Sequence, residues 1–149
     1  MNPEPQNPVD LDELYQEIIL DHFKHPRNAV KLSDEEALVD EENPTCGDRI
    51  KLTAAVKDGE VTSVKYEAHG CAISTASASM MSEAATGRSI SDVRAMVEEF
   101  TAMMRGEKEF SASDSDDIVA LEGVRRYPLR IKCATMPWHA ISKALDVLS

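Results

Sequence analysis

Two stretches of alternating apolar and polar residues flank an Asp-Gly pair in the middle of this chain, and they constrain its fold more than any other feature. The alternation over residues 49–56 is typical of a strand with one buried face. Asp58-Gly59 is a strong signal for a two-residue hairpin turn, and residues 61–68 form the returning strand. Residues 37–39 are a candidate for a short edge strand. The sequence therefore predicts a small antiparallel sheet of about three strands. The residues available for its buried face are Ile50, Leu52, Ala54, Val56, Val64 and Tyr66.

Helical periodicity lies on both sides of this predicted sheet, so we expect an α+β fold. Asp10 is placed to cap the first helix. Pro128 is expected to break the fourth, and Pro137 to lie in the first turn of the last, where its missing N–H costs nothing. Residues 107–117 are expected to form an acidic loop. Residues 1–149 form one domain in this interpretation, with a disordered tail over residues 1–9. The predicted helices cover residues 10–25, 71–86, 89–106, 118–124 and 134–148.

The charge balance restricts the partners of the chain. Its 16 basic and 27 acidic residues give a formal net charge of −11. Such a surface repels phosphate backbones and anionic lipid, so neither nucleic acid nor a membrane is expected as a partner. The first residues lack the basic and apolar regions of a signal peptide, and no apolar run reaches the length of a membrane helix. We therefore expect a cytoplasmic protein.

Three cysteines stand where one predicted element meets the next. Cys46 follows a turn and precedes a strand, whereas Cys71 and Cys133 each precede a helix, where the helix dipole favours a thiolate. Asp48 lies two residues after Cys46, with Gly47 between them. Three thiolates and one carboxylate form a four-coordinate set that zinc accepts. The spacing contains no CxxC pair, so it leaves open both a metal site and three semi-buried thiols without a function.

Six short stretches follow one another along the chain: Leu14-Tyr15, Ile19–His22, Pro26–Asn28, Asn43–Asp48, His69–Ser74 and Arg130–Thr135. Together they resemble the SufU branch of the IscU/NifU-like assembly proteins. The resemblance covers nearly the whole chain after residue 10, in order. It implies an α+β fold in which helices pack on one side of a small antiparallel sheet, and a metal site near the surface at one end. Carried over residue by residue, the metal ligands are Cys46, Asp48, Cys71 and Cys133.

Departures from the IscU-type scaffolds favour the SufU branch. Those scaffolds have a histidine directly before the last cysteine, where this chain has Lys132. Residues 127–132 do not match the Leu-Pro-Pro-Val-Lys segment that such scaffolds present to a chaperone. The acidic stretch 107–122 resembles the insertion that SufU-like proteins carry. These departures favour a zinc-dependent sulfur acceptor over a cluster scaffold.

The resemblance implies a sulfurtransferase of iron–sulfur cluster assembly, with no stand-alone small-molecule reaction. Cys46 would take persulfide sulfur from a SufS-type cysteine desulfurase and pass it, in the SUF pathway, to downstream cluster scaffold proteins. Cys46 is the catalytic candidate because it lies on a glycine-flanked loop. Arg130 and Lys132 are candidates to offset the negative charge of the site, and His69 is a candidate to line it.

The alternative is a scaffold that binds iron or assembles a 2Fe–2S cluster on the same ligands. A closed structural zinc site is a third interpretation. We expect His22 and His25 only as cations near the end of the first helix.

Overall fold

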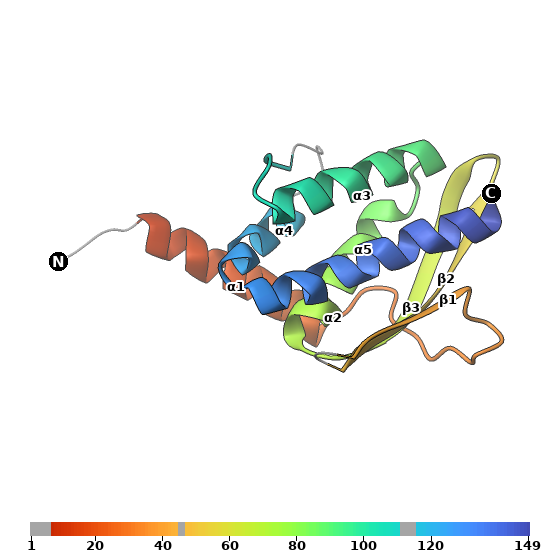
Figure 1. Ribbon diagram of the computed structural model, residues 1–149, viewed down its shortest axis with the longest axis horizontal. Helices are drawn as coiled ribbons and strands as arrows, with labels where there is room; N and C mark the ends of the chain where they lie inside the picture. The colour runs from red at the N-terminus through yellow and green to blue at the C-terminus, as the bar shows by residue number, and fades with distance from the viewer. Residues whose placement is uncertain (1–6, 45–46, 111–115) are drawn as a thin grey trace.

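A three-stranded antiparallel sheet in the order β1-β2-β3 forms one side of the molecule (Figure 1). The computed structural model describes residues 7–44, 47–110 and 116–149. The strands are β1 (Val39–Asn43), β2 (Asp48–Lys57) and β3 (Glu60–His69). At the β2–β3 turn, Asp58 and Gly59 have φ values of 54° and 78°, which fits the predicted two-residue hairpin turn. The hairpin prediction is therefore confirmed.

The helices lie on one side of this sheet, as expected, with α2 and α5 directly against the strands (Figure 1). The first helix begins at Asn7, three residues before the predicted start. None of the helices in the described part of the chain is both long and apolar enough to cross a membrane. The helical elements are α1 (Asn7–Lys24), α2 (Ala72–Ala85), α3 (Ile90–Met104), α4 (Asp116–Val119), the 3₁₀ helix η1 (Ala120–Arg126) and α5 (Pro128–Leu148).

The core lies between the sheet and its helical layer. Ile50, Leu52 and Tyr66 point from the strands into this layer and are fully buried. The face of α2 that meets them is made of small residues such as Ala76 and Ala78, which let the helix approach closely. Burial of one face explains the alternating apolar pattern of the strands, whereas α2 is marked in the sequence by its small residues.

One hydroxyl joins the two central helices. Ser77 of α2 donates to the carbonyl oxygen of Ala134 in α5 at 2.5 Å and accepts from Nε1 of Trp138 at 3.0 Å. Trp138 also stacks on Phe100 of α3, with ring centroids 4.4 Å apart. Because Trp138 is fully buried, the Ser77 hydroxyl satisfies a polar group that would otherwise be costly to bury.

The expected boundaries of the last helix were wrong. The helix α5 begins at Pro128, six residues before the predicted start, and Pro137 lies inside it. Pro128 starts the helix instead of breaking one, because proline at the first helical position loses no hydrogen bond. At residue 137 the ring removes the N–H that would bond the Cys133 carbonyl. Burial of this part of α5 against α2 offsets that loss.

The edge strand was also misplaced. It covers Val39–Asn43 instead of residues 37–39, and Val39 pairs with Leu52 while Asn43 pairs with Asp48. Residues 40–42 are acidic and carry no apolar pattern, so only pairing with β2 identifies them as a strand.

Replacing Trp138 by alanine is expected to lower the free energy of unfolding by about 3–5 kcal/mol, because it removes a large buried side chain. Urea denaturation followed by circular dichroism would measure this. Trp138→Phe should cost less, because a phenyl ring can still stack on Phe100 although the bond to Ser77 is lost. The exposed Val147→Ala is the control and should change stability by less than about 0.5 kcal/mol. Equal losses for Trp138→Ala and Trp138→Phe would contradict the role given to the stacked ring.

Candidate metal centre

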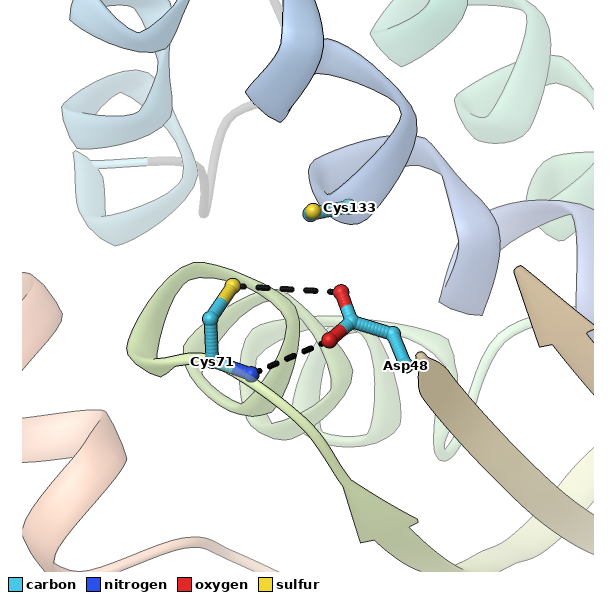
Figure 2. Close-up of side chains that lie close together, drawn as sticks. All are labelled: Asp48, Cys71 and Cys133. Atoms are coloured by element: carbon cyan, nitrogen blue, oxygen red, sulfur yellow. Dashed lines mark hydrogen bonds between the residues drawn. The ribbon is translucent and has the colours of Figure 1, made fainter. Parts of the chain in front are cut away.

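Asp48, Cys71 and Cys133 meet at one end of the sheet (Figure 2). One ligand atom from each side chain, a carboxylate oxygen or a sulfur, lies within 4.8 Å of the other two. Asp48 and Cys133 are buried and Cys71 is partly exposed. These three residues come from the start of β2, the junction of β3 with α2, and α5. The structure therefore brings together three of the four residues predicted as ligands.

The register of the β2–β3 hairpin places Asp48 and Cys71 close together. Arg49 pairs with His69, so the start of β2 and the end of β3 lie side by side at the open end of the hairpin. Asp48 and Cys71 extend from this end. The N–H of Cys71 donates to Oδ1 of Asp48 at 3.1 Å, and its thiol contacts Oδ2 at 3.8 Å (Figure 2). The N–H bond fixes the orientation of a buried carboxylate.

Gly70 makes this close approach possible. A Cβ atom at this position would lie 2.7 Å from Cγ of Asp48 and 2.7 Å from Oγ of Ser74. A Cβ atom essentially never lies that close to another heavy atom, so any side chain here would displace the carboxylate. The glycine is required for space beside the ligand.

Cys133 reaches the site from within a helix. We expected it just before a helix start, and that expectation was wrong, because α5 begins at Pro128. Its Sγ lies 4.0 Å from the carbonyl oxygen of Leu129, one turn earlier. The dipole of α5 therefore gives its thiolate no special stabilisation, since that effect falls off within the first turn. Other positive charge must stabilise a thiolate at this position.

Arg130 supplies such a charge. The negative charge of Cys71, followed by hydrogen bonds to the sulfurs of Cys133 and Cys71, raises the pKa of the Arg130 guanidinium above its usual value. Lys132 is exposed and its amine has no partner among the described residues. Of the two basic residues expected to offset the negative charge of the site, Arg130 is therefore the one with a described interaction with the sulfurs.

His69 does not line the cluster as the sequence suggested. Its imidazole is exposed and pairs with Glu67 at 2.8 Å, not with any of the three ligand side chains. Residues 67 and 69 lie on the same face of β3, which explains the pairing. Cys46, the fourth predicted ligand and the catalytic candidate, lies outside the described residues.

The donor set fits a divalent ion that accepts both sulfur and oxygen ligands. Two thiols and a carboxylate within mutual reach match the ligand types of zinc. Softer thiolate-selecting ions and iron–sulfur clusters use similar sets, although carboxylate is less usual for a cluster. The buried carboxylate of Asp48 beside two sulfurs favours a cation at this point.

A second cluster, not foreseen from the sequence, joins α1, α2 and α4. His22 is buried, and its Nδ1 and Nε2 lie 2.7 Å from Oγ of Ser79 and 2.7 Å from Oδ2 of Asp117. Ligand atoms of His22, Glu83 and Asp117 are also within 4.8 Å of one another. However, both ring nitrogens already have hydrogen-bond partners, and Arg27 lies 3.8 Å from Glu83. The geometry indicates a structural link between helices. No local sequence pattern predicts this link, because the partners of His22 are 57 and 95 residues away.

Comparison with known proteins identifies close relatives. Residues 14–134 match the family model of the NifU-like N terminal domain. The zinc-dependent sulfurtransferase SufU of Bacillus subtilis is 46% identical over 137 residues, which is 92% of each chain. The iron–sulfur cluster assembly scaffold protein IscU of Streptococcus pyogenes is 36% identical over 91% of this chain and 84% of its own.

Solved structures share the fold. A scaffold protein of the SUF system from Fervidobacterium islandicum, described as a candidate for iron–sulfur cluster assembly, superimposes with a TM-score of 0.77 at 33% identity. The match covers 89% of this chain and 97% of that one. A second crystal structure, of a hypothetical protein, gives a TM-score of 0.82 at 36% identity and covers 91% and 98%.

Gly70→Ala is expected to weaken the affinity for zinc, used as the probe ion, by about 10–100-fold, because the added methyl group displaces Asp48. Competition with a chromophoric chelator would measure the affinity. Gly123→Ala is the matched control, since a Cβ there meets no atom within 4 Å. If both variants bind zinc as the unmodified chain does, Asp48 does not need its observed position for metal binding.

Proposed function

The chain belongs to the family of NifU-like N-terminal domains, and from this premise we propose that it is a zinc-dependent sulfur carrier of iron–sulfur cluster assembly. The observation that carries the proposal is the convergence of Asp48, Cys71 and Cys133 within 4.8 Å. A relative 46% identical over 92% of the chain is a zinc-dependent sulfurtransferase, which supports zinc as the ion. Cys46, two residues before Asp48, is proposed as the fourth ligand.

The bound ion would keep the cysteine thiols deprotonated at neutral pH. The remaining chemistry belongs to the residues of the chain. Asp48 is held by the N–H of Cys71, so it can remain in place while a sulfur ligand leaves. Arg130 lies beside both described sulfurs and reduces the repulsion between several negative ligands.

Cys46 is proposed as the residue that receives sulfur. Its thiolate would attack the outer sulfur of a persulfide on a cysteine desulfurase. A new S–S bond forms on Cys46, and the S–S bond of the desulfurase persulfide breaks. The electron pair of the broken bond stays on the desulfurase cysteine, which leaves as a thiolate. Sulfur moves between two cysteines with no added oxidant or reductant.

Cys71 and Cys133 are less suited to this role. Cys71 is held between β3 and α2 by its backbone bond to Asp48, and Cys133 is buried inside a helix. A sulfur that must leave the metal and reach a partner needs freedom to move. The glycine beside Cys46, with a φ of 77°, provides a turn that other residues rarely adopt.

The alternative function is a scaffold that assembles a 2Fe–2S cluster on the same ligands. Relatives called IscU, including one 36% identical, support it. Lys132 argues against it, because it occupies the position of the histidine that distinguishes those scaffolds and cannot provide an imidazole ligand. We therefore propose the sulfur carrier, with a SufS-type cysteine desulfurase as donor and a downstream cluster scaffold protein as acceptor.

Cys46→Ala should abolish acceptance of sulfur from a SufS-type desulfurase, because the receiving thiolate is missing. Alkylation of persulfides followed by mass spectrometry of the intact chain would detect the added sulfur. Lys57→Ala, an exposed residue at the far end of the hairpin, is the control and should accept sulfur normally. Normal persulfide formation on the Cys46→Ala chain would exclude Cys46 as the acceptor.

The metal content of the purified protein distinguishes the sulfur carrier from the cluster scaffold. Protein purified anaerobically without added metal should be colourless and contain about one zinc ion per chain, because zinc has no visible absorption and suits this donor set. Elemental analysis and a visible spectrum would measure both properties. Brown protein that contains iron and acid-labile sulfide would support the scaffold instead.

A further inference from the structure

The link between α1, α2 and α4 also contains the side chains of a metal site. One ligand atom from each of His22, Glu83 and Asp117 lies within 4.8 Å of the other two. Each residue comes from a different helix, and none belongs to the cluster that contains the cysteines. An imidazole and two carboxylates are ligand types that zinc and iron(II) accept.

The imidazole of His22 is held as that of a metal ligand would be. It is buried, and its Nδ1 lies 2.7 Å from Oγ of Ser79. A histidine that binds a metal through one nitrogen usually donates the N–H of the other to an oxygen, which fixes the ring. Ser79 offers such an oxygen, and the backbone N–H of Arg27 holds it in place at 2.9 Å. The nitrogen that remains for an ion is therefore Nε2.

The contact between Nε2 of His22 and Asp117 leaves room for this exchange. Nε2 lies 2.7 Å from Oδ2, a distance at which a proton forms a hydrogen bond. Two ligands of one zinc ion, each about 2.0–2.2 Å from it, lie roughly 3 Å apart. An ion that replaces the proton therefore needs only a small outward shift of Asp117. That shift is open to it, because its side chain is 49% exposed.

The charges around this point favour a cation. The guanidinium of Arg27 lies among three carboxylates: its pKa is raised first by the hydrogen bond to Asp21 and then by the charges of Asp21, Glu83 and Asp117. It lies 2.8 Å from Asp21 but 3.8 Å from Glu83, so Glu83 keeps most of its capacity to bind an ion. With a neutral imidazole, three carboxylates and one guanidinium sum to −2. One divalent ion would balance this charge.

We propose that His22, Glu83 and Asp117 form a second metal site, which takes a divalent ion such as zinc or iron(II). The ion binds Nε2 and one oxygen of each carboxylate, and water completes its coordination. It ties α4 to α1 and α2 more firmly than the hydrogen bond does. Because both carboxylates are about half exposed, this ion binds more weakly than one held by thiolates and enters when metal is added. The proposal does not depend on the sulfur-carrier function, since it uses none of the same residues.

The test is calorimetric titration of zinc into the full chain that already carries one zinc ion, which the thiolates retain as the stronger ligands. The unmodified chain should bind a second ion. Asp117→Asn should raise the Kd of this ion at least about tenfold, because it removes a charged ligand while it keeps the shape of the side chain. Asp58→Asn makes the same change at the exposed hairpin turn and should leave this Kd unchanged.

The imidazole is tested in the same way. His22→Gln should abolish the second binding event, whereas His25→Gln, at an exposed position three residues later, should not. Circular dichroism would verify folding, and Asp117→Asn decides alone if His22→Gln unfolds. The second ion should raise Tm in the unmodified chain but not in Asp117→Asn. The proposal is overturned if the unmodified chain binds no second ion, or if Asp117→Asn binds it with unchanged Kd.

Discussion

The hydrogen bond from the N–H of Cys71 to the carboxylate of Asp48 connects the sheet to its helical layer, and the metal centre depends on it. Asp48 is buried at the start of β2, where a carboxylate without partners would be costly. The backbone donor is available because Cys71 stands before the first turn of α2, whose N–H groups have no helical partners. Gly70 provides the space. Strand register, helix start and one glycine therefore act together to present an oxygen and a sulfur to the same point.

The third ligand is held by a different kind of constraint. Cys133 lies within α5, whose position is fixed by Trp138 and by the hydroxyl of Ser77 on α2. Rigid helix packing leaves this sulfur little freedom to move. A site that must release one sulfur ligand and retain the others benefits when its sulfurs differ in mobility. The two described sulfurs are anchored, and in the proposed mechanism the movement belongs to Cys46, which precedes Gly47 between β1 and β2.

Local patterns were sufficient for the hairpin, for α2 and α3, and for the identity of Asp48, Cys71 and Cys133 as neighbours, the last through motifs shared with a family. Local patterns failed where tertiary contacts decide a helix boundary or the role of a side chain. Pro128 can end one helix or begin another, and only the packing of α5 on α2 selects the second option. His22 looked like an ordinary cation near a helix end, but its partners Ser79 and Asp117 are brought to it by the fold. Short-range periodicity carries no information about such contacts.

The charge beside the sulfurs is the last constraint on the site. Two cysteines and a carboxylate concentrate negative charge at one end of the sheet, on a chain whose formal net charge is −11. Arg130 lies three residues before Cys133 in α5, and the sulfurs of Cys71 and Cys133 raise the pKa of its guanidinium. Because a guanidinium stays charged at any physiological pH, it offsets the repulsion between these ligands without exchanging a proton.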